Sequence, residues 1–125
     1  MDLNQVTLPC SDYTASVEFY KTLGLRQIVD SPPRYARFET PRGTTLSIHE
    51  APVGSSNSAV VIYFEVEDLQ AAVDSLKLKG LKFDSGPTDE RWLWSEARLT
   101  DPAGNRICIF KAGENRRFPP WRIDA

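Results

Sequence analysis

The feature that most limits how this 125-residue chain can fold is an internal repeat. Segment 6–27 aligns without a gap to segment 62–83, at a constant offset of 56 positions. Six of the 22 aligned positions are identical: Asp12 and Asp68, Ala15 and Ala71, Val17 and Val73, Lys21 and Lys77, Gly24 and Gly80, Leu25 and Leu81. A second offset, of 61 positions, aligns 40–50 with 101–111. The pattern predicts one structural module that is present twice.

Both modules begin with the same local signals. Residues 3–8 alternate between apolar and polar side chains, and 60–64 form an apolar run, so each segment is predicted to be a strand. Asp12 and Asp68 are suited to cap the N-terminus of a helix, and apolar residues follow each of them at helical spacing. A glycine 12 residues after each cap is expected to end the helix, so the second helix is predicted over 69–79.

Three short strands are expected after each helix. They are predicted at 26–29, 35–39 and 44–49 in the first module, and at 81–83, 92–99 and 106–110 in the second. The tripeptides Pro41-Arg42-Gly43 and Pro102-Ala103-Gly104 favour tight turns. Each turn would join the last two strands of its module as a hairpin.

These elements predict an α+β fold of two tandem βαβββ modules within a single domain, 1–125. Module one spans 1–50, a linker 51–58, module two 59–111 and a C-terminal tail 112–125. One helix covers only one face of a sheet, so we expect the strands to form a cupped mixed sheet around a central trough. Such a trough is a natural site for a small molecule.

Composition excludes several classes of function. Fifteen basic and 17 acidic residues give a net charge of −2, unlike the basic surfaces that bind nucleic acid. The longest apolar run, 59–64, is far shorter than the roughly 20 residues of a membrane-spanning helix, and we expect no secretory leader. Two cysteines form no disulfide framework, so a cytoplasmic location is expected. His49 is the only histidine, which excludes a site built from several imidazoles of one chain.

Three segments resemble the glyoxalase/bleomycin-resistance/dioxygenase family, also called the vicinal oxygen chelate superfamily. They are 6–25, which ends in Phe-Tyr-x-x-Leu-Gly-Leu, then 64–69, and the Asp-Pro-Ala-Gly-Asn turn at 101–105. The resemblance covers residues 3–111 and implies both the paired βαβββ fold and a homodimer. Family members include lyases, dioxygenases, epimerases, thiol transferases and metal-free drug-binding proteins, so the resemblance selects no single chemistry.

The resemblance also implies where metal ligands would lie. In the metalloenzymes of the family, each module supplies one ligand from its first strand and one from its last. Carried onto this chain, the positions are Gln5, Ser47, Val61 and Cys108, and the two repeat offsets support this mapping. Ser47 is a poor ligand and Val61 has no donor atom, so we expect neither the family's metal site nor a cofactor. A divalent metal held by Gln5, His49 and a glutamate stays open as an alternative.

Side-chain parity predicts what else faces the trough. If the four mapped positions face inward, the same face also carries Thr7, His49, Tyr63, Glu65, Trp94, Glu96, Arg98 and Phe110. Ala97 and Leu99 would then face the helix. Cys10 and Cys108 are interpreted mainly as small packing residues.

We carry three hypotheses for function. The first is a metal-independent protein that binds a small metabolite or drug; its candidate binding residues are Gln5, Thr7, Ser47, Tyr63, Glu65, Trp94, Arg98 and Cys108. The second is a lyase or isomerase in which His49 transfers a proton, with Glu96 or Glu65 orienting it. The third is a protein-interaction role of the C-terminal tail.

The tail contains two large aromatic residues, Phe118 and Trp121, in a segment without regular periodicity. Large apolar side chains are usually covered, so we expect both to pack. The tail would clasp a partner subunit, cover the trough, or fold back on its own module, and the sequence does not decide between these arrangements.

Overall fold

The structure is a computed structural model that describes residues 1–57 and 59–123. Its contacts divide the chain into two compact units. The first unit is Met1–Val60 together with Thr100–Asn105, and the second is Val61–Leu99 together with the residues from Arg106 onward. Each unit contains one four-stranded sheet and one α-helix.

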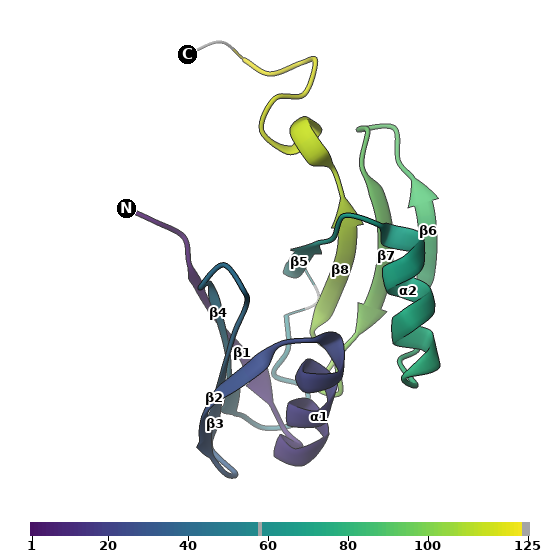
Figure 1. Ribbon diagram of the computed structural model, residues 1–125. Helices are drawn as coiled ribbons and strands as arrows, with labels where there is room; N and C mark the ends of the chain where they lie inside the picture. Colours follow the sequence, from purple (N-terminus) through teal and green to yellow (C-terminus); the bar gives the residue numbers. More distant parts are fainter. Residues whose placement is uncertain (58, 124–125) are drawn as a thin grey trace. The chain divides into compact units, whose positions relative to one another are not determined.

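The first unit is a βαβββ module (Figure 1). Its elements are β1 (Gln5–Cys10), α1 (Tyr13–Leu23), β2 (Arg26–Ser31), β3 (Tyr35–Glu39) and β4 (Thr45–Glu50). The sheet order is β1-β4-β3-β2, in which β1 runs parallel to β4 and the other neighbours are antiparallel. Helix α1 contacts β3.

The second unit repeats this arrangement. Its elements are β5 (Val61–Glu65), α2 (Leu69–Leu78), β6 (Ser85–Asp89), β7 (Ser95–Thr100, of which Thr100 is grouped with the first unit), β8 (Arg106–Lys111) and the 3-10 helix η1 (Gly113–Arg116). The sheet order is β5-β8-β7-β6, with β5 parallel to β8. The predicted α+β fold of two βαβββ modules is therefore confirmed.

The helix boundaries follow from the predicted caps. The side chain of Asp12 accepts a hydrogen bond of 3.1 Å from the backbone N–H of Ala15, and Asp68 accepts one of 3.0 Å from Ala71. Gly24 ends α1 at a φ of 112°, a left-handed conformation that glycine adopts without strain.

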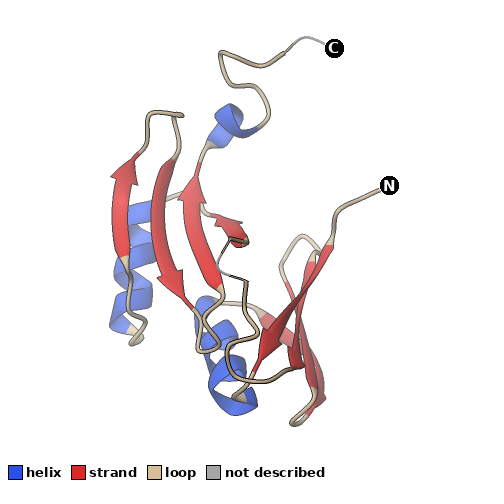
Figure 2. Ribbon diagram, turned by 180° about the vertical axis from the view of Figure 1, so that it is seen from behind, coloured by secondary structure: helices blue, strands red, loops and turns tan. Residues whose placement is uncertain are grey.

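Each helix packs its apolar side on its own sheet. Helix α2 buries Leu69, Val73 and Leu76 and contacts β6 and β8. Figure 2 shows the strands of this unit in front of α2, so the helix lies on one face of the sheet only. Ala97 and Leu99 of β7 are buried, as expected for residues on the helix side.

Two predicted strands of the second module are wrong in position. Residues 81–83 are not a strand, because the N–H of Leu81 closes the helix end by donating to the carbonyl of Leu76. The strand begins instead at Ser85, as β6. The predicted strand 92–99 begins only at Ser95, since the chain turns beforehand and Leu93 has a φ of 69°.

The turn at 101–105 belongs to the first unit by its contacts. The buried carboxylate of Asp101 accepts hydrogen bonds from the backbone N–H groups of Ala103 and Asn105 and from the hydroxyl of Tyr20. The amide of Asn105 donates to the carbonyl of Pro9 at 2.9 Å. The Asp-Pro-Ala-Gly-Asn turn therefore has a structural role, since the side chains of Asp101 and Asn105 form hydrogen bonds within the first unit.

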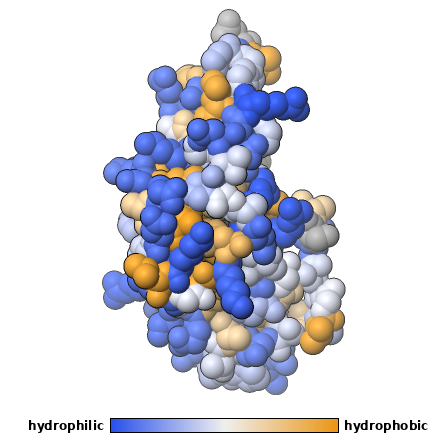
Figure 3. All heavy atoms as spheres, turned by 90° about the vertical axis from the view of Figure 1, so that its right-hand side faces the viewer, coloured by the Kyte–Doolittle hydropathy of each residue, from blue (hydrophilic) through white to orange (hydrophobic). Residues whose placement is uncertain are grey.

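Hydrophilic side chains cover most of the face in Figure 3, with smaller hydrophobic groups between them. Across the described residues, no helix has the length and apolar character needed to cross a membrane.

Candidate functional site

Three aromatic rings gather on the face of the second sheet opposite α2. Trp94 stacks on Phe110 with ring centroids 4.7 Å apart and an angle of 25° between the planes. Tyr63 presents its ring edge-on to Trp94 at 5.8 Å and to Phe110 at 5.4 Å. Phe110 is buried, Trp94 is half-buried and Tyr63 is 43% exposed. This aromatic cluster, Tyr63, Trp94 and Phe110, thus keeps part of its surface open to a ligand.

A partly buried ion pair borders the aromatic cluster. Glu96, only 3% exposed, accepts hydrogen bonds of 2.7 Å from the guanidinium of Arg98 and from the indole N–H of Trp92. Arg98 also donates to the hydroxyl of Tyr63 at 3.4 Å. Burial disfavours the charged form of Arg98, but the hydrogen bonds to Glu96 and Tyr63, together with the nearby Cys108 and Tyr63, outweigh burial and raise the pKa. Sequence reasoning missed Trp92, the second partner of Glu96.

Cys108 is fully buried and packs beside the aromatic cluster. Its neighbours are Phe110, Ala112, Val61 and Trp94. Burial, followed by the negative charge of Glu96, raises the pKa of the thiol to about 12. A thiol with a raised pKa is a poor nucleophile, and the contacts of Cys108 are those of a packing residue. Its predicted contact with a ligand stays a prediction.

Glu65 holds the C-terminal segment against the second sheet. One oxygen of its carboxylate accepts hydrogen bonds from the backbone N–H groups of Ala112 at 2.9 Å and Gly113 at 3.0 Å. The other lies 3.6 Å from the guanidinium of Arg116. These contacts engage the start of η1, and they occupy the carboxylate that was predicted to contact a ligand.

The predicted residues of the first unit form a hydrogen-bonded group on its sheet. The amide of Gln5 donates to the hydroxyl of Ser47 at 2.9 Å and to that of Thr7 at 3.2 Å. Ser47, which is fully buried, also shares a hydrogen bond of 2.5 Å with the hydroxyl of Tyr35. Gln5 accepts a further hydrogen bond from Thr45.

Tyr35 and Arg37 complete this group, and sequence reasoning missed both. The Nε of Arg37 donates to the Tyr35 hydroxyl at 2.9 Å, and its guanidinium lies 5.4 Å from the centre of the same ring. The repeat could have identified them, because the offset of 61 also aligns Ala36-Arg37 with Ala97-Arg98. We call Gln5, Tyr35, Arg37 and Ser47 the hydroxyl cluster.

His49 lies at the end of β4 and is exposed. Its Nδ1 is 3.0 Å from the carbonyl oxygen of Glu50, and its ring faces Tyr35 edge-on at 6.4 Å. Its predicted partners, Glu65 and Glu96, belong to the second unit, where the contacts above occupy both carboxylates. The proton-transfer role of His49 stays a prediction.

Comparison with known proteins identifies the family. Residues 2–109 match the model of the Glyoxalase/Bleomycin resistance protein/Dioxygenase superfamily. The chain belongs to this superfamily. It is also 32% identical over 126 residues to the uncharacterized protein YraH of Bacillus subtilis strain 168, a match that covers 89% of this chain and 98% of YraH.

Several solved structures share the fold. A glyoxalase/bleomycin resistance protein/dioxygenase from Nocardioides matches with a TM-score of 0.79 at 24% identity, covering 99% of this chain and 90% of its own. TnmS3, described as an antibiotic-binding protein from Streptomyces sp. CB03234, matches with a TM-score of 0.75 at 21% identity, covering 90% of this chain and 96% of its own.

The four superfamily ligand positions of this chain do not suit a divalent metal. The amide of Gln5 and the hydroxyl of Ser47 are hydrogen-bonded to each other, Val61 has no donor atom, and Cys108 is buried among Val61, Trp94, Phe110 and Ala112 without a histidine or a second thiol beside it. Within residues 1–57 and 59–123, no three His, Cys, Asp or Glu side chains form a group that could hold a metal ion.

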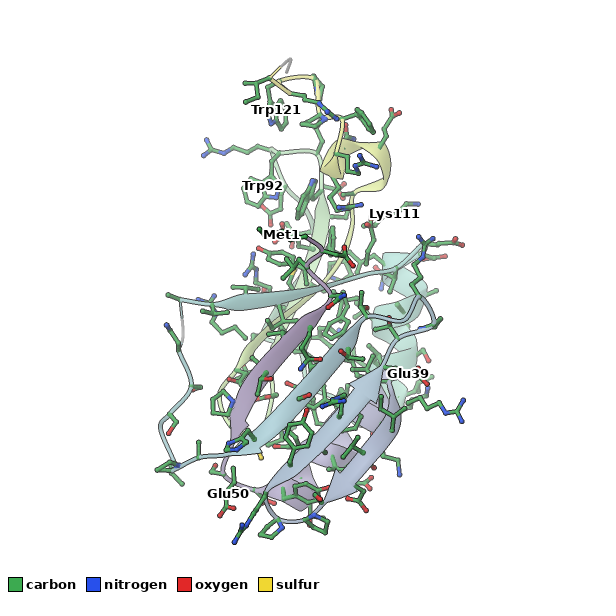
Figure 4. All side chains as sticks on the ribbon, turned by 90° about the vertical axis from the view of Figure 1, so that its left-hand side faces the viewer. Met1, Glu39, Glu50, Trp92, Lys111 and Trp121 are labelled. Carbon is green, nitrogen blue, oxygen red and sulfur yellow. The ribbon has the colours of Figure 1, made fainter. Side chains whose placement is uncertain are left out.

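Two further features lie away from the predicted residues. A cavity of about 300 Å³ in the first unit is lined by Gly24, Arg26, Glu39, Thr40 and Pro41. In the tail, Phe118 and Trp121 are 55% and 56% exposed, so their packing on this chain is partial. Arg122 lies over the Phe118 ring at 4.4 Å. Figure 4 labels Trp121 in this tail and Trp92 in the loop before β7.

Proposed function

We propose that this protein binds a small planar aromatic molecule, a metabolite or a drug, on the aromatic cluster of its second unit, without a metal cofactor. The observation that carries the proposal is the stacked pair Trp94 and Phe110, with Tyr63 left 43% exposed beside it. Small-molecule sites combine apolar and aromatic lining with a few fixed polar groups.

The polar groups of this face support the same proposal. Arg98 is held by Glu96 and by the Tyr63 hydroxyl, so its guanidinium has a defined position next to the rings. Aromatic stacking contributes about 0.5–1.5 kcal/mol per ring pair beyond area burial, and a fixed polar partner adds orientation. The structural likeness to TnmS3, described as antibiotic-binding, is in keeping with this chemistry.

Tryptophan fluorescence tests the proposal directly. The probes are 2-naphthamide, which is planar and neutral, and cyclohexanecarboxamide, which has the same polar group but no aromatic ring. We expect 2-naphthamide to quench the emission saturably and cyclohexanecarboxamide to have no effect. The Trp94→Phe variant should lose most of the quenching, since the removed indole lies at the centre of the aromatic cluster.

Trp121→Phe is the matched control, because it removes an exposed indole of the tail. This variant should keep the wild-type quenching curve. Equal quenching in Trp94→Phe and in the wild-type protein, or no saturable quenching by naphthalene and larger planar probes, would overturn the proposal.

We further propose that the protein acts in the cytoplasm as a homodimer. Both cysteines, Cys10 and Cys108, are free and buried, in keeping with a reducing compartment. The half-exposed aromatic side chains of the tail suit an interface between subunits. Light scattering of the purified protein should give twice the chain mass of 14.1 kDa, and a monomer at micromolar concentration would contradict the dimer.

A further inference from the structure

An arginine occupies the same repeat position in both modules, but only the arginine of module two forms an ion pair with a carboxylate. Arg37 on β3 and Arg98 on β7 are separated by the repeat offset of 61, and each donates to a tyrosine hydroxyl. In the second unit, Arg98 forms an ion pair of 2.7 Å with Glu96. The residue of the first unit that corresponds to Glu96 is Tyr35, which is neutral.

Within the described part of the chain, no carboxylate therefore neutralises the positive charge of Arg37. Among residues 1–57 and 59–123 it forms no ion pair, and its two terminal nitrogens have no hydrogen-bond acceptor. The carboxylate nearest to it along the strand, Glu39, is two residues away at the end of β3 (Figure 4). A guanidinium with free N–H groups in one plane matches the two oxygens of a carboxylate or phosphate.

The hydroxyl cluster fixes this guanidinium in place. The Nε of Arg37 is bonded to Tyr35, and Tyr35 is bonded to the fully buried Ser47, so the side chain is anchored at its inner end. Anchoring lowers the entropy that a binding event would otherwise cost.

We propose that the hydroxyl cluster is a binding site for the carboxylate or phosphate group of a small molecule, with Arg37 as its cation. Module two provides the internal parallel, because the carboxylate of Glu96 there occupies the partner position that a ligand would occupy next to Arg37. The proposal does not depend on the aromatic cluster, since it uses a different unit and different residues.

NMR of the ¹⁵N-labelled full-length protein tests the site. The probes are sodium benzoate, phenyl phosphate and the neutral benzamide, and the readouts are the Arg37 side-chain Nε–Hε signal and the Ser47 amide signal. We expect at least one of the two anions to shift both signals saturably, and benzamide to leave them unchanged. A response to benzoate alone or to phenyl phosphate alone identifies the anion; silence toward both overturns the proposal.

Three variants sharpen the test, each checked for a wild-type-like spectrum elsewhere. Arg37→Gln should weaken the Ser47 response at least about tenfold, because it removes the charge-assisted hydrogen bonds. Arg42→Gln removes the same charge from the hairpin turn and should leave the affinity unchanged. Tyr35→Glu introduces the carboxylate of module two and should abolish anion binding.

Equal weakening by Arg37→Gln and Arg42→Gln would mean general electrostatic attraction and would overturn the site. Tryptophan quenching by 2-naphthamide reports on the aromatic cluster alone, so failure of one proposal is distinguishable from failure of the other.

Discussion

The hydroxyl of Tyr20 on α1 donates a buried hydrogen bond of 2.5 Å to the carboxylate of Asp101, 81 residues further along the chain. Tyr20 is fully buried, and burial followed by the charge of Asp101 raises the pKa of its phenol. The pair connects the helix of module one to the turn of module two, and both partners are counted in the first compact unit.

We predict that Tyr20→Phe lowers the free energy of unfolding by about 1–3 kcal/mol, because a buried carboxylate loses one of its donors. Tyr13→Phe is the matched control: its hydroxyl bonds Asp30 near the surface, and its loss should cost less than about 1 kcal/mol. Urea unfolding followed by circular dichroism measures both variants. Equal costs for the two variants would contradict the prediction.

The cysteines predict a loss of stability at high pH. Burial is the main cause that raises the pKa of both Cys10 and Cys108 above the ordinary value of 9.0, that of Cys108 to about 12. The unfolded chain therefore releases its thiol protons first, so the contribution of the thiols to stability is constant below about pH 9 and falls as pH rises above it. For Cys108 we expect a loss of about 2 kcal/mol between pH 9 and 11.

Urea midpoints measured from pH 7 to 11 check this prediction, and Cys108→Ala should show a smaller decline than the wild-type protein. The thiols should also be unreactive toward Ellman's reagent at pH 8 in the native state and both reactive in urea. Rapid native modification of either cysteine would show that the thiols are accessible, against this account.

Glu65 is predicted to hold the C-terminal segment against the second sheet. Glu65→Ala removes the acceptor of the Ala112 and Gly113 N–H groups, so the segment should detach more often. Trypsin should then cleave after Arg116 and Arg117 several times faster, as measured by mass spectrometry over time. Glu67→Ala, at an exposed position two residues away, should keep the wild-type cleavage rate. No difference between the variants would rule out this anchoring role.

Two glycines with the same φ of +86° provide a matched test of packing, Gly86 in β6 and Gly43 in the hairpin turn. A Cβ on Gly43 meets nothing within 4 Å, so Gly43→Ala should cost only about 1–2 kcal/mol of backbone strain. A Cβ on Gly86 would collide with the carbonyl oxygen of Glu96 and lie 2.8 Å from the Cα of Ala97.

Gly86→Ala should therefore destabilise the protein by about 3 kcal/mol or more, because the obstacle is backbone that cannot rotate away. Thermal and urea unfolding of the two variants give the comparison. The prediction fails if the Gly86 variant is no less stable than the Gly43 variant.

Interactions between residues close in the sequence made much of the fold predictable. The caps Asp12 and Asp68 act within three residues, so the sequence indicates both helices directly. The strand β6 was not predictable in the same way, because Ser85-Gly86-Pro87 is typical of a loop and becomes a strand only through pairing with β7.

The candidate site was predictable only in part. Alternation along the strands predicts one face for Tyr63, Trp94, Arg98 and Phe110, and in the structure Tyr63 contacts the other three. Parity does not reveal what a side chain binds. Glu65 accepts hydrogen bonds from two backbone N–H groups that lie 47 and 48 residues further along the chain. These hydrogen bonds depend on the path of the chain after β8.

The hydrogen bond between Tyr20 and Asp101 also determines how the chain can be divided. A cut in the linker separates the repeats in sequence, yet fragment 1–57 would keep the Tyr20 phenol and lose its acceptor, while the other fragment would retain the Asp101 turn without its donor. Each fragment therefore lacks one partner of this hydrogen bond, and the other fragment contains it. Expressed separately, the two fragments should regain native structure only when mixed, as a complementing pair.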